Sequence, residues 1–162
     1  MKKLVMLSLG LVLGVANAAE TANSETTKPK EQAQQPVAVL RVFDTSGSSP
    51  KVLDKNRFSR SKARELCLIV GNVPVQENNL FVHYLQAPAA FKVDVPADIA
   101  KVEAEENGKN YLITKNVTKA EMPKGEAAFC WRFGKEDPIG EYKVDAQFND
   151  IVFKNLKFTV LK

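Results

Sequence analysis

The chain contains one histidine, two cysteines and three methionines in 162 residues. A lone histidine cannot assemble the multi-ligand sites in which proteins usually hold zinc or copper, so we expect no metal. The single histidine, His83, lies in the apolar stretch Leu80–Leu85. We expect it to be on a strand surface or hydrogen bonded rather than a ligand.

The motifs of common catalytic sites are also missing. The sequence has no Gly-x-Ser-x-Gly elbow, no His-Glu-x-x-His pair and no glycine-rich phosphate loop. Its carboxylates include the run Glu103, Glu105 and Glu106, which is typical of a solvated face. We therefore expect a protein that is not an enzyme and that uses no cofactor.

The chain also has no large excess of one charge and no long apolar run. The 23 Lys and Arg residues stand against 19 Asp and Glu residues, a formal net charge of +4, which makes nucleic acid a poor candidate as partner. The run from Leu4 to Val15 is shorter than the roughly 20 residues that a membrane-spanning helix needs. We expect no transmembrane segment in the mature chain.

What the first residues do contain is the three-part layout of a secretory signal. Lys2-Lys3 precedes the apolar run, and Ala16-Asn17-Ala18 places small residues where a peptidase would cut. The pattern predicts a signal peptide over residues 1–18 and a bacterial protein that is periplasmic or secreted. Residues 19–35 contain no aromatic and no large aliphatic side chain, and therefore predict a disordered leader.

Residues 36–162 are expected to form one domain, in which apolar residues recur with a period of two. Turn-forming residues separate these segments at intervals typical of an all-β sandwich or barrel, and we favour a single antiparallel β-sandwich. Residues 37–43 read as a strand covered on both faces, whereas residues 96–106 could hold a helical turn. Further strands are expected over residues 66–70, 80–85, 91–95, 111–117, 128–133, 142–148 and up to 160.

One short motif resembles a known family. Asp137-Pro138-Ile139-Gly140-Glu141-Tyr142 leads into an alternating strand, a two-residue turn and a last strand. This stretch is similar to the closing hairpin of bacterial exported immunoglobulin-like domains, and the resemblance implies an immunoglobulin-like sandwich. Fold alone implies no function. Trp131 departs from the antibody pattern, because it follows the second cysteine instead of lying between the two.

Cys67 and Cys130 most simply form one disulfide in an exported chain. The alternatives are two buried free thiols or a reactive pair, although no Cys-x-x-Cys motif suggests redox catalysis. Strand parity places Phe129, Trp131 and Phe133 on one face and Cys130 on the other. Either the aromatic face is the core and the disulfide lies outside, or the disulfide crosses the core and the rings form an exposed partner site.

Residues 51–64 are the densest basic stretch. They contain Arg57, Arg60, Lys62 and Arg64, and their single acidic residue is Asp54. These cations could contact anionic envelope material or an acidic partner protein. The alternative is a solvated connection between two strands.

Together these features predict an exported, non-catalytic binding or accessory protein of the bacterial envelope that acts through protein–protein contacts. Two other functions remain open. One is a secreted inhibitor or immunity-type protein that blocks a wall-degrading enzyme, for which the loop 134–140 is the candidate contact. The other is a small-ligand or metal carrier. The oligomeric state and the identity of the partner are not specified by any pattern in the chain.

Overall fold

The computed structural model describes residues 34–105 and 107–162. The predicted signal peptide and all but the end of the predicted leader lie outside the described residues. The described residues form one compact unit. In the described part of the chain, no helix has both the length and the apolar character needed to cross a membrane.

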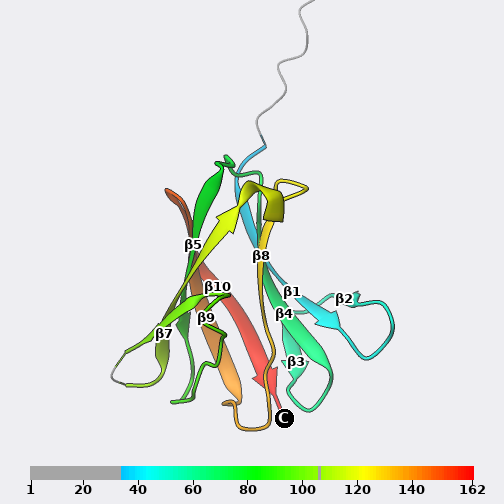
Figure 1. Ribbon diagram of the computed structural model, residues 1–162. Coiled ribbons are helices and arrows are strands. Elements are labelled where there is room, and N and C mark those ends of the chain that lie inside the picture. The colour runs from blue at the N-terminus through cyan, green and yellow to red at the C-terminus, as the bar shows by residue number, and fades with distance from the viewer. Residues whose placement is uncertain (1–33, 106) are drawn as a thin grey trace, which may run out of the picture. The chain divides into compact units, whose positions relative to one another are not determined.

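The strands of this unit form two sheets that face each other (Figure 1). The small sheet has the order β2-β1-β4-β8. The large sheet has the order β3-β10-β9-β5-β7-β6. The strands of the small sheet are β1 (Val37–Asp44), β2 (Lys51–Leu53), β4 (Arg64–Gly71) and β8 (Ala127–Trp131). Those of the large sheet are β3 (Arg57–Ser59), β5 (Asn78–Gln86), β6 (Lys101–Ala104), β7 (Asn110–Thr118), β9 (Gly140–Phe148) and β10 (Ile151–Leu161).

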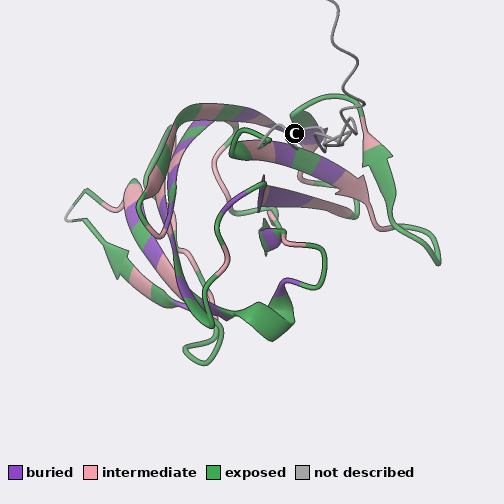
Figure 2. Cartoon of the chain, turned by 90° about the horizontal axis from the view of Figure 1, so that it is seen from above, coloured by how far each residue is buried: buried purple, intermediate pink, exposed green. Residues whose placement is uncertain are grey.

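The core lies between the sheets, because each strand turns alternate side chains inward. Figure 2 shows buried and exposed residues alternating along the ribbons. Among the largest buried side chains are Leu66 and Leu68 from β4, Phe81 from β5, and Tyr142 and Phe148 from β9. Their period of two is the pattern that predicted the strands, and the expected β-sandwich is confirmed.

The order of the long strands is immunoglobulin-like. In the small sheet, β1, β4 and β8 take the places of strands A, B and E. In the large sheet, β10, β9, β5 and β7 take the places of strands G, F, C and C′. Near the start of β9, the Tyr142 hydroxyl donates a 2.8 Å hydrogen bond to the carbonyl of Pro138. This is the tyrosine corner of such sandwiches. It explains why the Pro138-x-Gly140-x-Tyr142 stretch is similar to their closing hairpin.

The expectation of a strand over residues 91–95 is wrong, because these residues alternate in burial but form no strand. The helical turn considered for the next stretch is present before β6, where the N–H groups of Ile99 and Ala100 both bond to the carbonyl of Pro96. The Phe91 N–H bonds to the Gly108 carbonyl, and the Phe91 carbonyl accepts a bond from the Tyr111 hydroxyl. Residues 92–95 make no hydrogen bond between main-chain groups with a described residue. A period of two in the sequence indicates which side chains are buried. It does not indicate whether a neighbouring strand is present to form main-chain hydrogen bonds.

The connection expected over residues 51–64 contains the short strands β2 and β3 instead. Phe58 on β3 is 4 % exposed, and its ring centroid lies 5.5 Å from that of Phe133. The pairing of β3 with β10 is parallel, so the sandwich is not wholly antiparallel. Strand β1 is covered on one face rather than two, because Val37 and Arg41 are exposed on the outer face.

Candidate binding site along the free edge of strand β8

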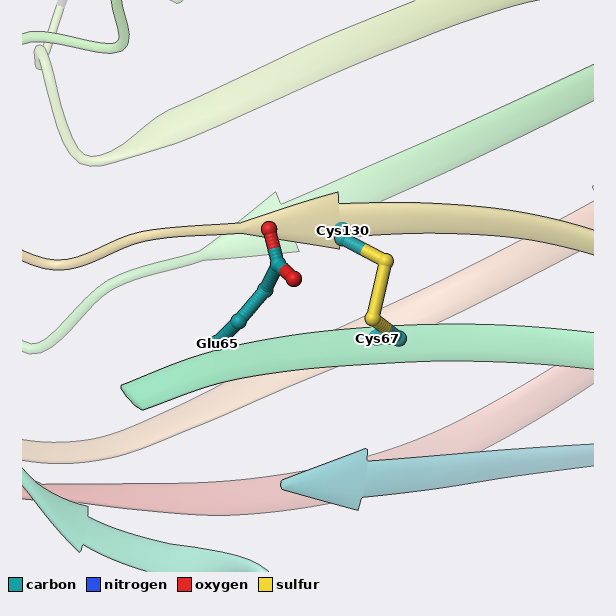
Figure 3. A group of neighbouring side chains, drawn as sticks. All are labelled: Glu65, Cys67 and Cys130. Carbon is teal, nitrogen blue, oxygen red and sulfur yellow. A yellow bond between two sulfur atoms is a disulfide. The ribbon is translucent and has the colours of Figure 1, made fainter. Parts of the chain in front are cut away.

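The disulfide joins neighbouring strands of the small sheet on its outer face (Figure 3). Cys67 on β4 and Cys130 on β8 are cross-strand partners whose Cα atoms are 4.0 Å apart. Phe129 and Trp131 flank Cys130 and point into the core, where they are 6 % and 7 % exposed. Of the two arrangements open from the sequence, the structure has the aromatic core and the outer disulfide. Phe133 lies beyond the end of β8 and is half-buried.

Glu65 lies beside the two sulfur atoms, as Figure 3 shows. A carboxylate and two cysteines at this spacing resemble a set of metal ligands. The two sulfurs are bonded to each other, however, so neither is the thiolate that a metal would bind. The Glu65 carboxylate instead accepts a 3.2 Å hydrogen bond from Nε of Arg132.

His83 lies in the core and not on a surface, which corrects the expectation for it. Its ring centroid is 4.1 Å from that of Phe81, 4.8 Å from Phe129 and 5.4 Å from Trp131. Neither of its nitrogens, nor Nε1 of Trp131, has a hydrogen-bond partner among the described residues. Burial, with a smaller contribution from the charge of Lys115, lowers the pKa of His83 from 6.5 to about 3. The imidazole is therefore neutral at physiological pH.

A groove follows the free edge of β8. This strand is one of the two edge strands of the small sheet and, within the described ranges, pairs with β4 alone. Residues 91–99 form the opposite bank. One cavity of about 320 Å³ lies between Trp131 and Phe133 on one side and Phe91 and Val93 on the other.

A second cavity, of about 230 Å³, continues along Ala128 and Phe129 toward Ile99. Both cavities are lined by Asp94, Val95 and Cys130, so they adjoin. We call them together the edge groove. All three aromatic residues of the segment 129–133 line it, although two of them also form part of the core.

The rim of the edge groove carries both signs of charge. Lys92 and Asp94 stand on the 91–99 bank, while Arg132 and Asp137 stand on the other. Lys115 lines the second cavity and pairs with Glu121 at 3.3 Å. An apolar floor with a mixed charged rim is the usual composition of a protein-binding surface.

The predicted basic residues do not form one free patch. Arg64 pairs with Asp44, whose pKa is lowered first by hydrogen bonds from Ser46 and then by Arg64. Arg60 donates a hydrogen bond to the main-chain carbonyl of Asp137, a residue that lines the groove. Arg57 and Lys62 are exposed. None of the four lines the edge groove.

Residues 38–161 match the model of a family described as the PM0630 beta sandwich domain. The chain belongs to this family. It is 42 % identical to the uncharacterized protein PM0630 of Pasteurella multocida (strain Pm70), over the whole length of both chains. The crystal structure of an immunoglobulin-like protein from Pseudomonas aeruginosa is also similar. It has a TM-score of 0.44 and 10 % identity over 80 % of this chain and 99 % of that one.

The family description names an architecture and no reaction. For this member of the PM0630 family, the site that sequence reasoning missed is the bank formed by residues 91–99. Residues 91–95 of this bank were predicted as a strand because they alternate, and the prolines on either side, Pro88 and Pro96, were the available signal of an irregular backbone. Strand parity places Arg132 on the same face as Cys130, but the predicted partner-binding residues did not include it.

Proposed function

We propose that this protein is an exported, non-catalytic binding or accessory protein of the bacterial envelope, acting through protein–protein contacts in the periplasm or outside the cell. The edge groove carries this proposal. It combines cavities of about 320 and 230 Å³ with half-buried apolar side chains and exposed charges of both signs. Such a surface offers both apolar contact area and orienting polar groups to a partner.

The disulfide supports export. Cysteine pairs persist in oxidising compartments and are rare in the bacterial cytoplasm. Both cysteines of the chain are used in the Cys67–Cys130 bond. The signal-like first residues favour the same compartment, as sequence reasoning predicts.

The placement of reactive groups supports a non-catalytic role. The one histidine is enclosed by aromatic rings, and neither cysteine is a free thiol. The groups that most often serve as general base or nucleophile are thus not presented to a molecule in the edge groove. Lys92, Asp94 and Arg132 remain there as groups suited to orient a partner.

Site-specific crosslinking in the native envelope tests the proposal. A photo-reactive amino acid is placed at exposed Lys92, on the rim of the groove, and as matched control at exposed Lys143, on the outer face of the large sheet. We expect one specific protein adduct from position 92 and none from position 143. The same adduct from both positions, or none from position 92, contradicts the proposal. An adduct from position 139 alone favours the inhibitor hypothesis, since Ile139 is 47 % exposed in the loop 134–140.

A further inference from the structure

The main chain of β8 presents unpaired groups to the edge groove. Opposite residues of antiparallel strands alternate between hydrogen-bonded pairs, with Cα atoms about 5.5 Å apart, and closer non-hydrogen-bonded pairs. The 4.0 Å between the Cα atoms of Cys67 and Cys130 identifies a non-hydrogen-bonded pair. The N–H and C=O of Cys130 therefore point away from β4. Those of Ala128, two residues earlier on the strand, do the same.

The opposite bank is also extended and without strand partners. Phe91, Val93 and Val95 are half-buried, while Lys92 and Asp94 between them are exposed. Residues 92–95 make no main-chain hydrogen bond with any residue in the described ranges. The edge groove thus separates one free strand edge from a second segment that has strand-like alternation.

We infer that the edge groove binds an extended segment of a partner protein, which adds to the small sheet as a strand next to β8. This inference rests on the proposed function and names the form of its partner. The added strand would bond with Ala128 and Cys130, and its alternate side chains would contact the apolar floor around Trp131 and Phe133.

Electrostatic complementarity favours this occupant. The free edge presents a row of alternating partial charges, positive at each N–H and negative at each C=O. An extended main chain matches such a row with groups of opposite sign at the same spacing. The exposed Lys92 and Asp94 on one bank, with Arg132 on the other, could pair with charged side chains at the outward positions of the added strand.

Two other occupants fit less well. Residues 19–33 of this chain contain no aromatic or large aliphatic side chain to fill the apolar floor. A second copy would have to bring its own β8 past residues 91–99 of both molecules, because these residues flank each β8 edge. A single extended segment of a different protein has one such bank to pass, and its side chains can fill the apolar floor.

The test uses the oxidised protein and a phage-displayed library of random peptides about twelve residues long. We expect the selected peptides to have alternating apolar residues. Ala128→Pro removes the N–H that faces the groove and keeps the bonds to β4, whereas Ala128→Val keeps that N–H. Ala128→Pro is expected to weaken peptide binding about tenfold or more relative to Ala128→Val, the effect of one lost main-chain hydrogen bond. Equal binding by the two variants overturns the inference.

A second pair of variants covers the case in which Ala128→Pro does not fold. Asp94 is exposed and lines both cavities, so Asp94→Trp fills the groove without altering the core. Lys143→Trp is its control, because it adds the same ring at an exposed position outside the groove. Asp94→Trp should abolish peptide binding and Lys143→Trp should retain it. Retention by both variants overturns the inference.

Amide hydrogen exchange then locates the peptide. Slower exchange at Ala128 and Cys130 on binding is the expected result, and unchanged exchange at both overturns the inference. A library that yields no binder overturns it too. In that case a specific adduct from position 92 would still support the proposed function, so the two failures are distinguishable.

Discussion

Strands β5 and β8 contribute to the same part of the core but are held in different ways. β5 pairs with β7 along all of Asn78–Gln86 and with β9 along Phe81–Gln86. Among the residues that the structure describes, β8 pairs with β4 alone, over Val70↔Ala127 to Leu66↔Trp131. Their inward side chains meet where His83 of β5 contacts Phe129 and Trp131 of β8. In the described residues, β5 is thus hydrogen-bonded to strands along both of its edges, whereas β8 is hydrogen-bonded to a strand along one edge.

The difference indicates what the disulfide does. A strand bonded on both edges is held by two rows of hydrogen bonds, but β8 has one row and a covalent link to β4. That link keeps β8 attached while its second edge stays unpaired. Edge strands that remain open usually carry some protection against uncontrolled pairing. Here residues 91–99 lie alongside and restrict access to the edge.

The largest expected effect follows from removing the link. The double variant Cys67→Ala/Cys130→Ala should lower the free energy of unfolding by about 4 kcal/mol, the chain-entropy value for a loop of this length. Urea unfolding of the variant and the oxidised protein measures this. Hydrogen exchange in the variant should accelerate more at Phe129 on β8 than at Val82 on β5. Equal acceleration on both strands would mean that the disulfide has no special role at β8.

The contact between the two strands makes stability depend on pH through His83. Its pKa is near 6.5 in the unfolded chain and about 3 when folded, so the unfolded state binds more protons between these values. Acid therefore lowers stability in this range. From pH 7 to pH 5 the wild type should lose about 2 kcal/mol relative to His83→Leu. Parallel stability profiles of the two proteins would show that His83 does not stay neutral in the fold.

A smaller loss in the free energy of unfolding is expected from a variant on β9, the strand that pairs with β5. Tyr142 lies on the neighbouring strand β9, and Tyr142→Phe removes the bond to the Pro138 carbonyl. We expect a loss of about 1 kcal/mol, measured by urea unfolding. Tyr84→Phe is the control, because the Tyr84 hydroxyl bonds to Glu105 at an exposed site. Burial also raises the pKa of Tyr142, so its hydroxyl stays a donor in mildly alkaline buffer. A control loss as large as that of Tyr142→Phe would contradict the assignment.

The smallest effect concerns the ion pair beside the disulfide. Arg132 and Glu65 link β8 to β4 on the outer face, with the Arg132 side chain 75 % exposed. Arg132→Ala should cost less than about 0.5 kcal/mol, as is usual for exposed pairs. Arg64→Ala, which breaks a pair with a side chain only 15 % exposed, should cost more. The reverse order would show that the surface pair, and not only the disulfide, holds β8.

Much of the fold could be predicted from sequence, because its strands have one face in the core. Alternation located β5, β7, β8, β9 and β10 to within a few residues. The pattern could not show which strand edges find partners, since hydrogen bonds between strands depend on residues distant in sequence. For this reason residues 91–95 were predicted as a strand, and the short strands β2 and β3 were not predicted.

The candidate site was only partly predictable. Parity correctly grouped Phe129 and Trp131 on one face, but whether that face was inward depended on the position of the opposing sheet. His83 was expected at a surface or with a hydrogen bond. Its parity with Phe81 and Leu85 places it inward, and aromatic rings surround it there instead of polar partners. The groove itself required the spatial neighbourhood of residues 91–99 and 128–133.

Hydrogen exchange of individual β8 amides in the free, oxidised protein tests the central claim most directly. The account predicts fast exchange at Ala128 and Cys130, whose N–H groups face the groove, and slow exchange at Phe129, whose N–H bonds to β4. Slow exchange at all three amides would mean that residues 91–99 close onto the edge in solution. That result would contradict a free strand edge and the binding role built on it.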